Sequence, residues 1–479
     1  MYYFLPIILI AYFLVPKAAK NSILLIASLL FYAWGEPAYV FLMAGSIFMG
    51  YVSGLFIEKC KADTHNSHLQ SAGVQKKEQT YKNSKLAKVC MILAVVISLG
   101  LLGYFKYANF FIKNINIATG LSIPLLSVIL PIGISFYTFQ LISYILDVYR
   151  GDVVAQKNPI ALATYITMFP QLIAGPIVRY SDVEKELQNR AINFEKIAYG
   201  IRRFVLGLGK KIIIANVLGE FVSIFKDLEE KTLIFYWAYA IAVSLQIYFD
   251  FSGYSDMAIG MGSVLGFHFP ENFNYPFISK SVTEFWRRWH ISLGTWFRDY
   301  VYIPLGGSRC TKERNIFNIF VVWCLTGLWH GAEWTFVVWG LYFAILLMIE
   351  KLFYYKWLNK TKVIGHIYAI GISIISFVIF DGTTLAESIA TIGCMLGFEK
   401  IPIVNSVTWY YLKSYAGIIA IAILGATPLP KYFIQYLKKN VTMQKILDMA
   451  EPVFMIVLLL VATGYLVDGS FNPFLYFRF

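Results

Sequence analysis

The sequence predicts an all-α polytopic membrane protein, and three observations support this fold class. The 479 residues are 58% hydrophobic and only 14% charged, whereas soluble proteins carry roughly a quarter charged residues. The mean hydropathy is +0.62. Long apolar runs follow one another without the alternation of a membrane β-barrel. A straight span needs about 20 apolar residues. We therefore expect roughly 11 or more transmembrane helices, plus re-entrant and interfacial helices around a central tunnel.

The N-terminal third of the sequence predicts ordinary transmembrane helices. The first 16 residues lack the basic start and small-residue cleavage site of a signal peptide, so we expect a retained first span. The apolar run 22–57 is too long for one helix and is expected to break at Gly35-Glu36-Pro37. The loop 58–88 holds seven lysines against three acidic residues, which predicts a cytoplasmic loop and an N-terminus outside.

The middle of the chain is less regular. The segments from Pro170 to Pro176 and from Gly253 to Pro270 are short or interrupted by Gly and Pro, and we expect non-helical backbone there that is buried or lines a cavity. The segment 131–150 carries a polar stripe that either lines the cavity or contacts another helix: Ser135, Thr138, Ser143 and Asp147. The basic, amphipathic segment 179–211 is expected to form helices on the cytoplasmic face. The run 316–349 is expected to bend near Gly331.

Charge and cysteine content exclude other classes. The net charge is +13, but the basic residues cluster in loops between apolar runs, as positive-inside topology requires, so we expect no nucleic-acid partner. Five scattered cysteines without a CxxC pair indicate neither a disulfide framework nor a metal site. Two glycine pairs, at 207–209 and 260–262, lie in apolar helices and predict close helix packing. With no linker or internal repeat, residues 1–479 are expected to form a single domain.

The stretch 281–334 is the candidate catalytic core. It contains His290 and His330, each directly after a tryptophan, together with several arginines. An ionisable group at membrane depth is costly and is therefore a functional-site hypothesis. The alternative for either residue is a buried histidine that binds a backbone carbonyl. Two Trp-His pairs in one Arg- and Gly-rich region favour the functional interpretation.

Those residues suit acyl transfer from a thioester to a hydroxyl. A neutral imidazole can take the proton of the attacking hydroxyl, and burial disfavours the charged imidazolium. Backbone N–H groups, His290 or an arginine could supply the donors that a tetrahedral intermediate needs. The chain contains no GxSxG, P-loop or HExxH motif, and no bound cofactor is indicated.

Asp250 and Asp256 form a second polar cluster inside an apolar region. One interpretation is structural, in which either carboxylate pairs with an arginine of the 287–309 region. The other places either carboxylate in the site.

Three blocks resemble the signature motifs of the membrane-bound O-acyltransferase family. They are FDFSGYSDMAIGMG (249–262), FWRRWHISLGTWFRDYVYIPLGGSR (285–309) and GLWHGAEWTF (327–336). PIGISFYTFQ (131–140) and FPQLIAGPIVR (169–179) resemble further blocks of its bacterial branch. YIPLGGSR and the C-terminal FNPFLYFRF (471–479) are similar to the alginate O-acetyltransferase-like branch that acetylates polysaccharides.

The resemblance implies a helix bundle around a tunnel, with His330 as the essential catalytic residue and His290 as a supporting one. It also implies acetyl-CoA as cytoplasmic donor, a cell-surface polysaccharide acceptor, a bacterial inner-membrane location and an extracytoplasmic esterase-like (SGNH-type) partner. Two alternatives stay open: D-alanyl transfer to teichoic acid from a carrier-protein thioester, and a transporter or flippase without chemistry.

Overall fold

The computed structural model describes residues 3–69 and 84–468, and these residues form helices joined by loops, with no strand among them. The chain divides into two compact units, which we call the first and the second unit. The first comprises Met1–Ile197 with Gly262–Pro270, and the second comprises Ala198–Met261 with Glu271–Phe479. The single domain expected from the sequence stays a prediction.

The first unit contains eight helices in its described part and the start of a ninth. They are α1 (Phe4–Leu14), α2 (Lys20–Gly35), α3 (Tyr39–Leu69), α4 (Lys85–Thr119), α5 (Ile134–Arg150), α6 (Pro159–Thr167), α7 (Phe169–Leu172), α8 (Tyr180–Gln188) and α9 (Phe194–Gly209), with the short 3₁₀ turn η1 (Lys17–Ala19). The break predicted at Gly35-Glu36-Pro37 is confirmed. The helix ends there because a proline disfavours helical geometry in the residue before it.

Part of the expected cytoplasmic loop 58–88 is helical. Helix α3 continues to Leu69 and α4 begins at Lys85. Residues 70–83 of this loop lie outside the described residues, as does the C-terminal block 471–479.

Helix α5 is almost entirely buried, including all four residues of its polar stripe. It packs against α3 and α4, and Lys106 of α4 lies 3.5 Å from Ser135 Oγ. These contacts favour helix packing over a cavity-lining role. In the segment from Pro170 to Pro176 the short helix α7 ends at Leu172 and the remaining residues are non-helical, as predicted.

The second unit holds most of α9 and the remaining helices. The continuous group is α9, the π-helical turn η2 (Lys210–Ala215), α10 (Asn216–Asp227) and α11 (Leu233–Val264). Around the candidate core lie η3 (Pro276–Ile278), α12 (Val282–Arg288), α13 (Ile291–Phe297), η4 (Arg298–Tyr302), α14 (Lys312–His330) and α15 (Trp334–Ile349). The C-terminal elements are η5 (Glu350–Tyr354), α16 (Tyr355–Lys360), α17 (Ile364–Asp381), α18 (Leu385–Met395), α19 (Ser406–Gly425), α20 (Leu429–Leu437) and α21 (Val441–Val467).

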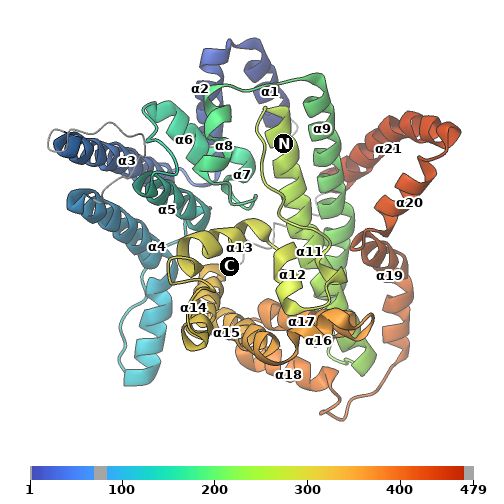
Figure 1. Cartoon of the computed structure of the whole chain (residues 1–479). Helices are drawn as coiled ribbons and strands as arrows, with labels where there is room; N and C mark the ends of the chain where they lie inside the picture. The colour runs from blue at the N-terminus through green and yellow to red at the C-terminus, as the bar shows by residue number, and fades with distance from the viewer. Residues whose placement is uncertain (1–2, 70–83, 469–479) are drawn as a thin grey trace. The chain divides into compact units, whose positions relative to one another are not determined.

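The non-helical backbone expected from Gly253 to Pro270 is found only after Val264, because α11 runs through Gly253 to that residue. Gly253 instead allows two helices to touch. A Cβ placed on Gly207 of α9 would lie 2.6 Å from the Gly253 carbonyl oxygen, and one on Gly260 would lie 2.6 Å from the Gly200 carbonyl oxygen. The predicted packing role of the glycine pairs is therefore supported, and α9 and α11 run side by side (Figure 1).

The predicted bend near Gly331 is confirmed, since α14 ends at His330 and α15 begins at Trp334. The two helices form a tight hairpin (Figure 1). A Cβ on Gly340 would lie 2.5 Å from the Trp323 carbonyl oxygen, and one on Gly327 would collide with the Phe336 carbonyl. Only glycine permits this approach, and the approach brings the end of α14 against the first turns of α15.

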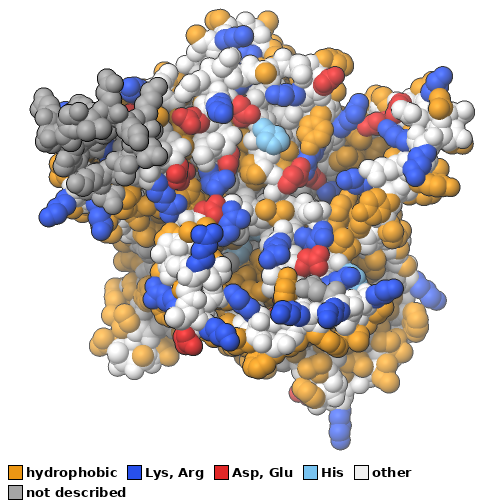
Figure 2. All heavy atoms as spheres, in the orientation of Figure 1, with side chains coloured by type: hydrophobic (Ala, Val, Ile, Leu, Met, Phe, Trp, Pro, Cys, Tyr) orange, Lys and Arg blue, Asp and Glu red, His pale blue; other side chains and the backbone are white. Residues whose placement is uncertain are grey.

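Eight helices among the described residues are long and apolar enough to cross a membrane, and α1 and α18 are shorter apolar helices. The polytopic helical class is confirmed, while the number of about 11 spans stays a prediction. Figure 2 shows Lys and Arg side chains over α12, α13 and α16, and hydrophobic side chains along the edge below them. The predicted central tunnel remains untested.

Candidate active site

The structure brings His290 and His330 together. They are 40 residues apart in sequence, yet their ring centroids are 6.4 Å apart and their planes are inclined by 64°. Both side chains are buried, with exposed fractions of 1% and 5%. Trp329 contributes to the same cluster, 5.9 Å from the His290 ring. The pairing that the sequence suggested but could not establish is therefore present in the second unit.

His290 lies between α12 and α13 in a left-handed backbone conformation, with φ of 45°. Such a conformation costs a non-glycine residue on the order of 1–3 kcal/mol. Neighbouring hydrogen bonds maintain it. The Ile291 N–H donates to the Asn272 carbonyl at 3.0 Å, and the Asn272 side chain reaches the ring of His290, with 3.2 Å between Oδ1 and Nδ1.

The hydrogen bonds of Asn272 decide the tautomer of His290. Asn272 Oδ1 accepts hydrogen bonds from the N–H and the hydroxyl of Ser292, at 3.2 and 2.9 Å. Asn272 Nδ2 donates to Ser255 Oγ at 3.1 Å. Because the atom facing His290 is thus an acceptor, Nδ1 of His290 is the protonated nitrogen and Nε2 carries the lone pair.

His290 lies outside the eight candidate spans, and burial lowers its pKa to about 3. The imidazole is therefore neutral near pH 7. Its Nε2 is buried and makes no hydrogen bond to the described residues. In this tautomer Nε2 can only accept a hydrogen bond, so the role of N–H donor that the sequence left open for His290 does not fit.

His330 ends α14 and is held among aromatic rings. Its ring centroid lies 5.0 Å from Trp329, 5.0 Å from Trp339 and 5.4 Å from Phe380. All three rings are close to perpendicular to the imidazole. Edge-to-face packing of this kind defines the plane of the imidazole and excludes water.

A cavity of about 600 Å³ opens beside His290, and we call it the histidine cavity. Its lining includes Trp286, Arg287, His290, Ile291, Arg298 and Thr326. The indole Nε1 of Trp286 is buried and makes no hydrogen bond to the described residues. Two side chains that line the cavity therefore carry a polar atom without a hydrogen bond to the described residues: the acceptor His290 Nε2 and the donor Trp286 Nε1–H.

The arginines of the core have different surroundings. Arg288 pairs with Glu284 one turn earlier, at 2.9 Å. Arg298 pairs with Asp299 at 2.7 Å and also lines the histidine cavity together with Arg287. Arg309 is exposed and does not line the histidine cavity.

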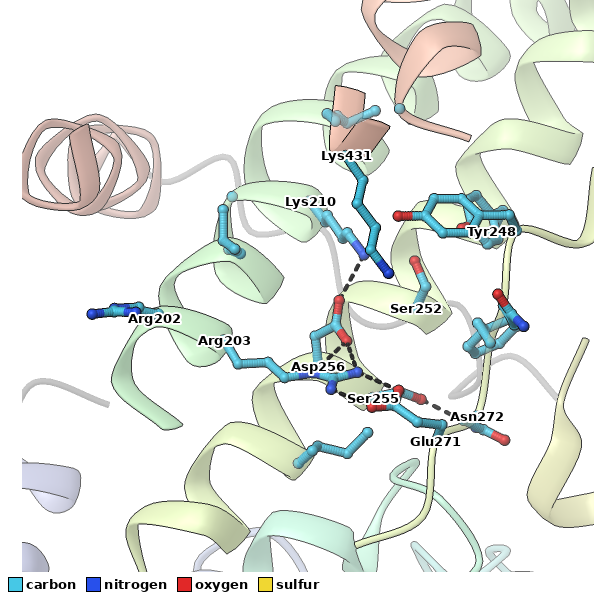
Figure 3. A pocket seen from close by; sticks show the side chains of 18 of the residues that line it. Arg202, Arg203, Lys210, Tyr248, Ser252, Ser255, Asp256, Glu271, Asn272 and Lys431 are labelled. Carbon is cyan, nitrogen blue, oxygen red and sulfur yellow. Dashed lines mark hydrogen bonds and ion pairs between the residues drawn. The ribbon is translucent and has the colours of Figure 1, made fainter. Parts of the chain in front are cut away.

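Asp256 belongs to a separate charged network. It binds Arg203 at 2.8 Å and Lys210 at 2.6 Å, and Arg203 also pairs with Glu271 (Figure 3). Asp250 pairs with Lys211. The structural pairing expected for these carboxylates is found, but the partner region 287–309 is wrong for Asp256. The π-helical turn η2 places Lys210 and Lys211 against α11 instead.

Asn272 and Trp286 are the residues that sequence reasoning missed. Asn272 lies in a loop before Pro276 with no helical or repeating pattern around it. Trp286 is one aromatic among many in the core stretch. The one sequence signal for Trp286 was its position four residues before His290.

Comparisons with known proteins identify a family and several relatives of the chain. The model of the membrane-bound O-acyltransferase family matches residues 154–388. A probable alginate O-acetylase AlgI of Azotobacter vinelandii is 36% identical and covers 100% of this chain and 98% of its own length. One from Pseudomonas aeruginosa is 44% identical over 73% of this chain and 64% of that protein. The chain thus spans slightly less than two thirds of that relative.

Other relatives carry different names. A peptidoglycan O-acetyltransferase of Helicobacter pylori is 33% identical over 83% of this chain and 79% of that protein. A teichoic acid D-alanyltransferase of Bacillus subtilis is 34% identical, but over only 48% of this chain and 61% of that protein. The proteins named for O-acetylation therefore match more of the chain than the D-alanyltransferase does.

Proposed function

Because the chain belongs to the membrane-bound O-acyltransferase family, we propose that it transfers acetyl groups for the O-acetylation of a cell-surface polysaccharide. Its acceptor is alginate-like, peptidoglycan or another exopolysaccharide. The observation that carries the proposal is the pair of buried imidazoles, 6.4 Å apart, beside a cavity that contains His290.

The donor in this proposal is acetyl-CoA from the cytoplasm, as a co-substrate and not as a bound cofactor. The acceptor hydroxyl attacks the thioester carbonyl, and His330 takes its proton as general base. A new C–O bond forms, the C–S bond breaks, and the proton on His330 passes to the departing thiolate. Atoms and charges balance without a metal or a redox partner.

His290 and Trp286 assist in different ways. His290 Nε2 accepts a hydrogen bond from the substrate and so orients it, a role that its neutral tautomer allows. The Trp286 indole N–H donates to the carbonyl oxygen, whose negative charge grows in the transition state. A donor in a cavity wall among aromatic rings is effective because little water competes with it.

The orientation and partner complete the proposal. We place the chain in the bacterial cytoplasmic membrane as a multi-pass protein, with the N-terminus outside and loop 58–88 in the cytoplasm. An extracytoplasmic esterase-like, SGNH-type protein would complete the transfer, so that the hydroxyl attacking the thioester belongs to an intermediate acceptor and the polysaccharide is the final acceptor.

The experiment compares ester-linked groups on the surface polymer of cells with and without this chain. We expect acetate to be released by mild alkali only when the chain is present. Cells with the exposed-histidine variant His268→Gln serve as the matched control and should retain acetylation. Release of D-alanine in place of acetate would support the teichoic acid alternative. Polymer export that requires the chain, with no ester-linked group on the polymer in either strain, would support a flippase. Either result would overturn the proposal.

A further inference from the structure

A second cavity, of about 990 Å³, lies wholly within the second unit, and we call it the Ser252 cavity (Figure 3). Helices α9, α11, α19 and α21 and the turn η2 contribute to its walls. One part of the lining is apolar: Leu206, Ile213, Ile214, Ile259, Phe454 and Leu458. Since α11, α19 and α21 are candidate membrane spans, this part of the wall suits an acyl chain.

The other part of the lining is charged. The cavity is lined by the basic residues Arg202, Arg203, Lys210 and Lys431 and by the acidic residues Asp256, Glu271 and Glu451. Arg202 pairs with Glu451 at 3.3 Å, and Arg203 and Lys210 share Asp256. Lys431 makes no ion pair with the described residues. The lining therefore has a surplus of one positive charge, carried by Lys431.

Ser252 is an unusual serine for a helix interior. Its exposed fraction is 2%, and its hydroxyl makes no hydrogen bond to the described residues. Ser244, two turns earlier in α11, donates to the Ala240 carbonyl at 2.6 Å, the usual solution for a buried helical serine. A buried hydroxyl without a hydrogen bond lowers the folded-state stability by about the free energy needed to remove it from water, unless a ligand forms the missing hydrogen bond.

Three donors converge on one part of the cavity. In Figure 3 the Lys431 ammonium, the Ser252 hydroxyl and the Tyr248 hydroxyl point toward the same space. A cation together with neutral O–H donors is the combination that recognises an anionic oxygen group such as a phosphate. The apolar wall begins next to these groups, so the ligand is an amphiphile.

We propose that the Ser252 cavity binds the phosphodiester headgroup of an anionic membrane lipid, with Lys431 and Ser252 as its ligands and the acyl chains along the apolar wall. A phosphodiester carries one negative charge, which matches the single surplus cation. A donor with several phosphates would leave most of its charge unmatched here. Basic pockets between membrane helices are established recognition sites for anionic lipids. The proposal does not depend on the acyl-transfer function.

Asn272 and Ile291 link the Ser252 cavity to His290. Both residues line the Ser252 cavity, and Ile291 lines the histidine cavity as well. Asn272 also contacts His290. A lipid bound in the Ser252 cavity would therefore lie against the loop that holds His290 in its left-handed conformation.

The test uses the full chain in nanodiscs of phosphatidylcholine with phosphatidylglycerol, released into mild detergent and weighed by native mass spectrometry. We expect one phosphatidylglycerol retained per chain. Lys431→Gln should lower its apparent affinity about five- to tenfold, and Ser252→Ala severalfold. The control Lys439→Gln removes an exposed lysine just beyond the same helix, outside the cavity lining, and should retain the lipid.

Competition separates the possible sources of phosphate. Inorganic phosphate and CoA at millimolar concentration should leave the lipid bound, because neither has acyl chains to fill the apolar wall. Displacement by CoA would reassign the cavity to the acyl donor and overturn the lipid assignment. Equal retention of phosphatidylcholine, or equal loss in Lys439→Gln, would overturn the role of Lys431. Size-exclusion profiles matching wild type would show that the variants are folded.

Discussion

His290 and His330 are both buried beside tryptophans, but the structure holds them by different interactions. His290 is held through hydrogen bonds: Asn272 contacts its Nδ1 and its backbone neighbour Ile291. Around His330 the structure shows aromatic rings at 5.0–5.4 Å. A hydrogen bond determines which nitrogen of an imidazole carries the proton, whereas ring packing determines the plane of the imidazole.

This difference suits the two imidazoles to different tasks, one as a constant hydrogen-bond acceptor and the other as a general base. His290 has a defined tautomer and a pKa lowered to about 3 by burial, so it suits a constant acceptor. A general base must gain and lose a proton in each cycle. His330, outside the Asn272 hydrogen-bond network that the structure shows, suits that task. The predictions below test whether the two roles are separate.

The largest effect is expected at His330. His330→Gln keeps a hydrogen-bonding side chain but removes basicity, so acetyl transfer should fall by roughly 10²–10⁴-fold. The measurement is acetate released from the surface polymer, normalised to the membrane abundance of the variant. Near-normal acetylation at equal abundance would show that His330 is not the base.

Trp286→Phe should have the next largest effect. The ring packing against Trp323 and Phe343 is largely kept, but the indole donor is lost, and removal of one oxyanion donor typically costs roughly 10²–10³-fold in kcat. Steady-state kinetics in reconstituted vesicles would measure this effect. Trp409→Phe is the control, since Trp409 is an exposed tryptophan that does not line the histidine cavity. If Trp286→Phe raised KM and left kcat unchanged, or if both variants lost the same factor in kcat, Trp286 would not have the proposed role.

His290→Gln should retain part of the activity. The amide oxygen of glutamine can still accept a hydrogen bond from the substrate, so we expect a loss of roughly tenfold, the value of about one hydrogen bond. The comparison with His330→Gln in the same assay is the decisive one. Equal losses in the two variants would mean that the histidines do not divide the work.

Asn272→Asp should change the pH profile and leave the maximum rate little altered. In the wild type His290 stays neutral as the pH falls from 7 to 5, because its pKa is about 3. A carboxylate beside Nδ1 favours the imidazolium and raises this pKa. The variant should therefore lose transfer as the pH falls over that range, while Asn272→Ser should not. Parallel pH profiles for wild type and Asn272→Asp would contradict the acceptor role of His290.

The same lowered pKa affects stability. The unfolded chain protonates His290 near pH 6.5, while the folded chain does so only near pH 3. Between these values the unfolded state binds more protons, so folded stability decreases as the pH falls. In His290→Gln this contribution is absent, and the acid sensitivity of thermal unfolding in detergent should be reduced.

The sequence alone determined the membrane class, the breaks at Gly35-Glu36-Pro37 and Gly331, and the two histidines as the residues to examine. These features are local: apolar run length, a proline that ends a helix, and ionisable groups in apolar surroundings are visible within about 20 residues. The close packing of the glycine pairs was also predictable, because small residues in apolar helices allow two helix backbones to approach each other closely.

Only the tertiary structure decided which residues meet. The backbone from Gly253 onward was expected to be non-helical, but α11 continues to Val264, and Gly253 packs against Gly207 of α9. Asp256 was expected to pair within 287–309, but η2 brings Lys210 to it. Asn272 carries no local signal, yet it sets the proton position of His290. Such contacts depend on how distant helices pack, and one sequence contains no periodicity that encodes a partner tens of residues away.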